Sequence, residues 1–276
     1  QYSQSYSISH TDPYTSVDGL SRTLGVQYRD ITQFVSAASD FSTTTISASM
    51  EFGYPITEFQ SLRFGLIAQI SDLVVNPRSS APEAVAWVSH NGNPYTRVIS
   101  GIAIDPDCEA PPPLASIVCG TKFNTFELVA GWFFDSRNRA IFADRGMRHS
   151  VSLSVAAPGS DVNYYVASYD FLQLIPLWKQ WTVALSGAFA YGQALGNDTT
   201  SLPPYRQFFA GGPESVRGFT ESRLGPKDGF GNPYGGNMKV VSHAELLLPV
   251  PKKMRASTRM SVFFDLGNVF SEGGGV

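Results

Sequence analysis

The stretch STTTISASMEFGYPI (42–56) alternates polar and apolar side chains with a period of two. Its even positions from Ile46 to Ile56 are apolar, whereas the odd positions from 43 to 51 carry Thr, Ser and Glu. Successive side chains of a β-strand point to opposite faces of the sheet. This stretch therefore predicts a strand with one continuous apolar face and one face of small polar residues.

The same alternation recurs in residues 61–70, 149–157 and 181–192. In each, the second face is built from Ser, Thr, Gly and Ala with only scattered charges. A soluble β-sandwich also alternates, but it would carry many Lys and Glu residues on its outer face. Small polar residues suit a hydrated lumen, so the pattern favours an all-β fold, a transmembrane antiparallel β-barrel.

The composition agrees with this fold class and excludes several functions. Only 16% of the 276 residues are charged and 13% are aromatic, and no run approaches the ~20 apolar residues of a spanning helix. A net charge of -3 without a basic cluster argues against nucleic-acid binding. The four His residues are dispersed, and neither a Ser-His-Asp spacing nor a phosphate-binding loop occurs. We therefore expect no catalytic residue, no cofactor and no metal site.

Turn signals divide the chain into ten predicted strands. They lie near 1–10, 20–30, 42–56, 61–71, 121–135, 148–157, 163–176, 180–193, 238–250 and 257–270. Short turns on one side alternate with two long connections, 72–121 and 194–237, which is the asymmetry of outer-membrane barrels. Within the first connection, Ser80 is expected to N-cap a short helix over 82–90.

The two ends of the chain predict an incomplete barrel. Residue 1 already lies in an alternating strand, and the final strand is followed by GGGV (273–276) rather than ending on an aromatic residue. We therefore expect an open sheet with edge strands near 1–10 and 257–270.

The two cysteines, Cys108 and Cys119, lie beside a proline-rich segment with prolines at 106 and 111–113. Two free thiols are the alternative, but this arrangement favours a disulfide formed in an oxidising compartment.

The segment FFAGGPESVRGF (208–219) places one cation, Arg217, in a glycine-dense loop. In the two strands that follow, the alternation puts Glu245 and Asp265 on the luminal face. If the loop folds into the lumen, Arg217 could contact both carboxylates, and Gly211, Gly212 and Gly218 would permit tight turns. The alternative is that the carboxylates only hydrate the lumen while Arg217 remains in water.

This segment, together with several others, resembles the BamA family. The similar stretches are DPYTSVDG (12–19), FGYPITEFQSLRFGL (52–66), PGSDVNYY (158–165), LGPKD (224–228), GGN (235–237), HAELLLPVP (243–251) and FFDLGNVF (263–270). The resemblance implies that 1–276 is part of a sixteen-strand outer-membrane barrel, from its fourth to its thirteenth strand, without POTRA domains. It also implies that 197–237 is the inward-folded sixth loop, with Val216, Arg217, Gly218 and Phe219 at its tip and Glu245 and Asp265 as partners of the Arg.

The family further implies a function without enzymatic activity or cofactor. Its members fold and insert β-barrel proteins into the outer membrane of Gram-negative bacteria without ATP. The implied partners are unfolded outer-membrane clients, accessory lipoproteins that bind through POTRA domains, and outer-membrane lipid. Two alternatives share the loop motif, a TamA-like barrel and a two-partner secretion transporter pore. The LGPKD, GGN and LPVP stretches favour BamA, and a simple porin leaves the loop unexplained.

Overall fold

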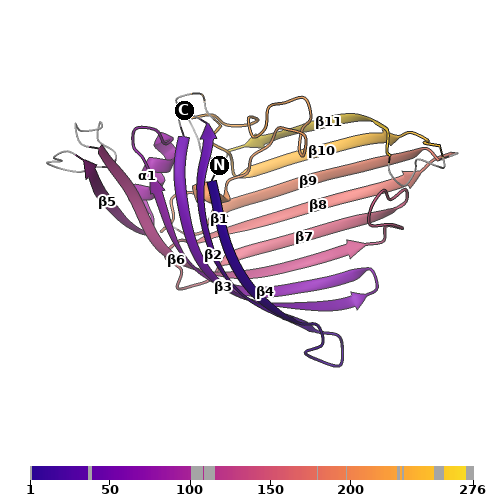
Figure 1. Cartoon of the computed structure of the whole chain (residues 1–276), viewed down its shortest axis with the longest axis horizontal. Helices are drawn as coiled ribbons and strands as arrows, with labels where there is room; N and C mark the ends of the chain where they lie inside the picture. Colours follow the sequence, from indigo (N-terminus) through magenta and orange to yellow (C-terminus); the bar gives the residue numbers. More distant parts are fainter. Residues whose placement is uncertain are drawn as a thin grey trace.

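In a computed structural model, the chain forms one curved antiparallel wall of strands, with a short helix beside β6 (Figure 1). The structure describes residues 2–36, 39–100, 108, 116–178, 180–196, 198–228, 231, 233–251 and 258–271. Eleven strands are formed by these residues: β1 (Tyr2–Asp12), β2 (Ser21–Ser36), β3 (Ser39–Thr57), β4 (Gln60–Val75), β5 (Asn93–Ser100), β6 (Ser116–Asp135), β7 (Gly146–Ala156), β8 (Tyr164–Pro176), β9 (Thr182–Ala194), β10 (Met238–Leu247) and β11 (Ser261–Phe270).

Ten of these strands pair in the order β1-β2-β3-β4-β6-β7-β8-β9-β10-β11, each antiparallel to its neighbour. Over the described residues no pairing joins β1 to β11, so the predicted open sheet with these two edges is confirmed. The ten-strand path also agrees with the predicted strands, except that residues 1 and 257 lie outside the described part.

The prediction for the connection 72–121 was wrong in two respects. β4 continues to Val75 and β6 already begins at Ser116, and the connection contains the additional strand β5, which pairs only with β6. Its sequence, NPYTRVIS, lacks a clear alternation and contains Pro94. Proline removes a hydrogen-bond donor and is tolerated on edge strands, so this pairing depends on the neighbouring β6 rather than on a local pattern.

The two faces of the wall follow the predicted alternation. Val262, Phe264 and Leu266 of β11 are 63%, 68% and 66% exposed and lie on the outer, apolar face. On the opposite face of the adjacent strands, Val241 and Val269 are buried beneath a loop. The apolar outer face is the surface that a barrel presents to lipid, and the inner face, which we call the luminal face, carries the polar and charged side chains.

The two ends of the wall differ. Turns between β3 and β4 and between β8 and β9 lie at what we call the short-turn end, and the segments between β4 and β6 and between β9 and β10 lie at the long-loop end. Several aromatic residues lie at the short-turn end. They include Tyr54 and Phe59 beside the β3–β4 turn and the stacked pair Trp132 and Phe134 of β6.

A small core covers the luminal face at the long-loop end. Helix α1 (Pro82–His90) buries Ala84, Val85, Trp87 and Val88 against β4 and β6. The predicted helix is confirmed, but the predicted cap is not. Ala81 occupies the N-cap position without a side-chain bond, because the Ser80 hydroxyl accepts a hydrogen bond from the Asn76 backbone N–H instead.

The predicted disulfide between Cys108 and Cys119 is present, with a Cα–Cα distance of 6.0 Å. It ties the connection after β5 to the buried start of β6. The prolines 106 and 111–113 lie outside the described residues. Among the described residues, no helix has the length and apolar character needed to cross a membrane.

Candidate functional site

The connection between β9 and β10, residues 195–237, returns across the luminal face, and we call it the luminal loop (described except for 197, 229, 230 and 232). Val216 near its tip is buried with Ala210 of the same loop against Val241 and Val269. Gly267 of β11 makes this close approach possible, since a Cβ there would lie 3.0 Å from Cγ2 of Val216. The tip therefore packs on the inner face of β10 and β11.

Backbone conformation explains the glycines of the loop. Gly211, Gly212 and Gly218 all have positive φ, the region that glycine adopts without steric cost. The constraint is strongest at Gly211, where φ is 109° and an added Cβ would lie 2.4 Å from the Thr220 carbonyl oxygen. A tight turn at this position brings the two arms of the tip together.

Arg217 makes the polar contacts of the tip. Its Nε donates to Oδ2 of Asp265 at 2.7 Å and its Nη2 donates to Oδ1 at 2.6 Å, a bidentate pair. Its Nη1 donates to Oε1 of Glu245 at 2.6 Å, and its backbone N–H donates to Asp265 Oδ2 at 3.0 Å. The structure thus brings together the three residues that the sequence predicted, Arg217, Glu245 and Asp265.

The electrostatics of the cluster depend on burial. The Asp265 side chain is only 3% exposed, whereas those of Arg217 and Glu245 are each 25% exposed. Hydrogen bonding to Asp265, and then to Glu245, raises the pKa of the Arg217 guanidinium against the opposing effect of burial. A cation fixed beside a buried carboxylate holds the loop by charge as well as by packing.

Two further contacts of this cluster were not predicted. Nδ1 of His243, which lies opposite Asp265 in the β10–β11 register, is 2.9 Å from Asp265 Oδ1. The guanidinium of Arg217 lies 3.6 Å from the ring centroid of Phe263, a cation–π geometry. The luminal phase of His243 was visible in the alternation, but the contact with Phe263 depends on how the loop descends.

The remaining residues of the predicted motif have unequal surroundings. Val216 is buried, whereas Phe219 is an exposed large hydrophobic residue. Both side chains are hydrocarbon and offer no group for catalysis.

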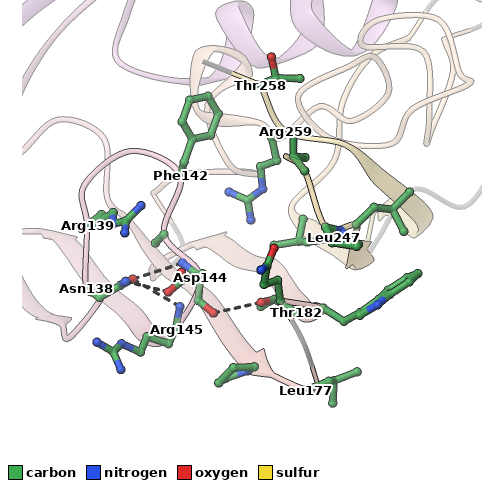
Figure 2. Close-up of a pocket in the computed structure, with 17 residues that line it drawn as sticks. Asn138, Arg139, Phe142, Asp144, Arg145, Leu177, Thr182, Leu247, Thr258 and Arg259 are labelled. Atoms are coloured by element: carbon green, nitrogen blue, oxygen red, sulfur yellow. Dashed lines mark hydrogen bonds between the residues drawn. The ribbon is translucent and has the colours of Figure 1, made fainter. Parts of the chain in front are cut away.

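A hollow of about 470 Å³ lies at the short-turn end (Figure 2). It is lined by the β6–β7 turn, the β8–β9 turn, the end of β10 and the residues just before β11. The turn is held to the wall by a hydrogen bond from Thr182 Oγ1 to the Asp144 carbonyl oxygen at 3.3 Å, and Asn138 binds Asp144 within the turn. In Figure 2 the Arg259 side chain extends into this hollow. These contacts hold the β6–β7 turn against the start of β9.

No group of three or more His, Cys, Asp or Glu side chains in the described part of the chain could hold a metal ion. Both carboxylates of the luminal cluster bind Arg217. The arrangement is suited to mechanical fixation of a loop.

Residues 1–276 match the Omp85 superfamily domain. The outer membrane protein assembly factor BamA of Neisseria meningitidis is 32% identical over 272 residues, 96% of this chain. A SAM50-like protein of Schizosaccharomyces pombe is 26% identical over 139 residues, 49% of this chain and 29% of its own length.

A solved structure has the same fold. The crystal structure of Haemophilus ducreyi BamA lacking POTRA domains 1–3 superimposes with a TM-score of 0.81 at 28% identity and covers 98% of this chain. The chain spans half of that structure and 31% of the Neisseria meningitidis protein. It therefore corresponds to part of a longer polypeptide in each of these relatives.

Proposed function

Because the chain belongs to the Omp85 superfamily, we propose that it is part of the barrel of an outer-membrane protein assembly factor of the BamA type. The activity is non-enzymatic: the barrel folds and inserts other β-barrel proteins into the outer membrane of a Gram-negative bacterium without ATP. The clients are unfolded outer-membrane proteins, and accessory lipoproteins bind the periplasmic POTRA domains of the whole protein. Within that barrel, this chain supplies the fourth to the thirteenth of sixteen strands.

The observation that carries this proposal is the fixed loop tip in the lumen. Residues 197–237 form the sixth loop of the barrel, and Arg217 is its anchor to Asp265 and Glu245. A passive pore needs only a ring of strands, so a loop fixed across the lumen by a bidentate ion pair favours a more specialised barrel. An assembly barrel must open at one seam between two strands. A loop fixed to the inner face keeps the other strands in place while the seam opens. In the family this seam lies between the first and last strands of the whole barrel, outside the strands of this chain, and its unpaired strand edges can bind client strands by β-augmentation.

Liposome reconstitution of the full-length protein tests this function. Purified protein is placed in lipid vesicles, a urea-unfolded outer-membrane protein is added, and the folded client is quantified by its altered mobility on unheated gels. We expect faster client folding than in empty vesicles or in vesicles that contain a porin.

The alternative of a secretion pore predicts a different result. Vesicles would then release an entrapped polypeptide or accept one from outside, without accelerating client folding. Equal folding rates in empty and loaded vesicles would contradict the proposed function.

A further inference from the structure

A second ion pair holds the luminal loop at a point far from the Arg217 contacts. Arg206 ends the short helix η1 (Pro204–Arg206), and its Nη2 contacts Oε1 of Glu127 on the luminal face of β6. The Glu127 side chain is only 2% exposed. A buried carboxylate is costly unless it is paired, and Arg206 supplies the opposite charge to Glu127.

A tyrosine completes this second site. The Tyr164 hydroxyl of β8 donates to Glu127 Oε1 at 2.5 Å and accepts a hydrogen bond from Arg206 Nε at 3.1 Å. The guanidinium also lies 5.5 Å from the centroid of the Tyr164 ring. We call Glu127, Tyr164 and Arg206 the root clamp. Its three members come from β6, β8 and the loop, so it joins the loop to the wall.

Aromatic side chains pack closely around the root clamp. Tyr205 stacks on Phe123 of β6 with ring centroids 6.0 Å apart, and Trp87 of α1 packs edge-on against the same Phe123 ring. The indole N–H of Trp87 donates to the Ser201 carbonyl oxygen at 3.0 Å, which fixes the loop just before η1. Arg206 is thus held among packed aromatic side chains at the point where the chain leaves η1 toward the tip.

The two fixed points lie on separate parts of the wall. Arg206 precedes Arg217 by eleven positions, and it binds β6, whereas Arg217 binds β10 and β11. Five strand spacings of about 4.8 Å separate β6 from β11 along the sheet, roughly 24 Å. A fully extended segment of this length would reach at most about 36 Å, and the tight turn at Gly211 shortens that reach, so the segment has limited slack. Between the ends, the bridge of Phe208 with Gly236 stiffens the segment.

We propose that the segment 206–217 is a tie across the lumen, and that Arg206 and Glu127 are positioning residues for the Arg217 tip. The tie fixes the distance between β6 and the β10–β11 wall. Weakening the root clamp then affects the Arg217 contacts as well as its own surroundings. The functional meaning of this tie rests on the proposed assembly activity, but its mechanical coupling does not.

Hydrogen exchange measured by mass spectrometry on the full-length protein tests the coupling. The readout is the peptide covering 214–220, since the Arg217 amide is hydrogen-bonded to Asp265. In Arg206→Met we expect about tenfold faster exchange of this peptide, the factor that corresponds to about 1.4 kcal/mol. Arg223→Ala is the matched control, because Arg223 is exposed in the same loop and forms no ion pair within the described part of the chain.

A second variant separates loss of the ion pair from general damage to the fold. Glu127→Gln combined with Arg206→Met leaves no unpaired buried charge, so this double variant should be more heat-stable than Arg206→Met alone. Its 214–220 peptide should still exchange faster than wild type, because the tie is still released. An unchanged 214–220 peptide in this folded double variant would overturn the tie.

The liposome assay and the exchange measurement test the two proposals separately. If clients do not fold faster but the exchange at 214–220 rises in Arg206→Met, the tie stands and the assembly function falls. If clients fold normally in Arg206→Met and its 214–220 peptide is unchanged, the tie falls and the assembly function stands.

Discussion

Replacing Arg217 with alanine tests whether the tip of the luminal loop is anchored. The change removes three side-chain hydrogen bonds of 2.6–2.7 Å and leaves Asp265 buried. The backbone N–H of residue 217 and the His243 ring would then remain within hydrogen-bond distance of that carboxylate, but neither replaces the guanidinium. Asp265 must therefore lose its favourable partner while staying largely removed from water.

The size of the effect follows from burial. Breaking a fully buried ion pair costs about 3–5 kcal/mol, whereas exposed pairs contribute about 0–1 kcal/mol. Asp265 is almost fully buried, but Arg217 is one-quarter exposed, which places the expected loss near the lower end of the buried range. We expect about 3 kcal/mol, or roughly a hundredfold change in the ratio of docked to released tip.

The first measurement is the temperature to which samples must be heated before the folded band of the full-length protein disappears from the gel. The second measurement is client folding in vesicles. Arg217→Ala should lower both. Arg217→Lys should restore them only in part, because an ammonium lacks the planar fork that binds both Asp265 oxygens. Arg223→Ala serves as the control from the same loop and should resemble wild type.

A double-mutant cycle with Asp265→Asn measures the coupling between the two side chains. The two changes together should destabilise less than the sum of the single changes, because each single change leaves one charge unpaired. If Arg217→Ala equals Arg223→Ala in heat stability and client folding, the anchor does not exist.

Three other predictions concern the loop and the core at the long-loop end. Gly211→Ala should release the tip at a cost of about 1–3 kcal/mol, because its φ of 109° is strained for any side chain and Cβ would meet the Thr220 carbonyl oxygen; wild-type hydrogen exchange at 214–220 would contradict this. Cys119→Ser should remove about 2–4 kcal/mol by opening the disulfide with Cys108, seen as lower heat stability that reducing agent does not lower further; equal stability with and without the bridge would refute it. Burial raises the pKa of Tyr205 to about 12, above its ordinary value near 10. Its contribution to stability is therefore complete below pH 10 and is lost as pH rises toward 12, so the unfolding free energy should fall over that window and fall less steeply in Tyr205→Phe.

The sequence was sufficient to predict ten of the eleven described strands, their two faces and their antiparallel pairing, but not β5. Alternation is a local property, because neighbouring side chains of a strand point to opposite faces whatever surrounds them. For this reason the luminal phase of Glu245 and Asp265 could be predicted, and the antiparallel order followed from short turns. The resemblance of residues 216–219 to the family motif then predicted that Arg217 binds those two carboxylates. The proximity of the cysteines to each other and to prolines was likewise enough to predict their bridge.

Contacts between segments that no local pattern relates could be found only in the tertiary structure. Glu127 lies in an alternating strand like any luminal residue, and nothing nearby marks it as the partner of Arg206, which lies 79 residues away. β5 forms because β6 extends beyond the neighbouring β7 and offers it an edge. Ser80 binds Asn76 rather than capping α1, a choice set by the turn before the helix. Such contacts depend on how the wall curves and on where the luminal loop crosses it, and these are properties of the packed chain.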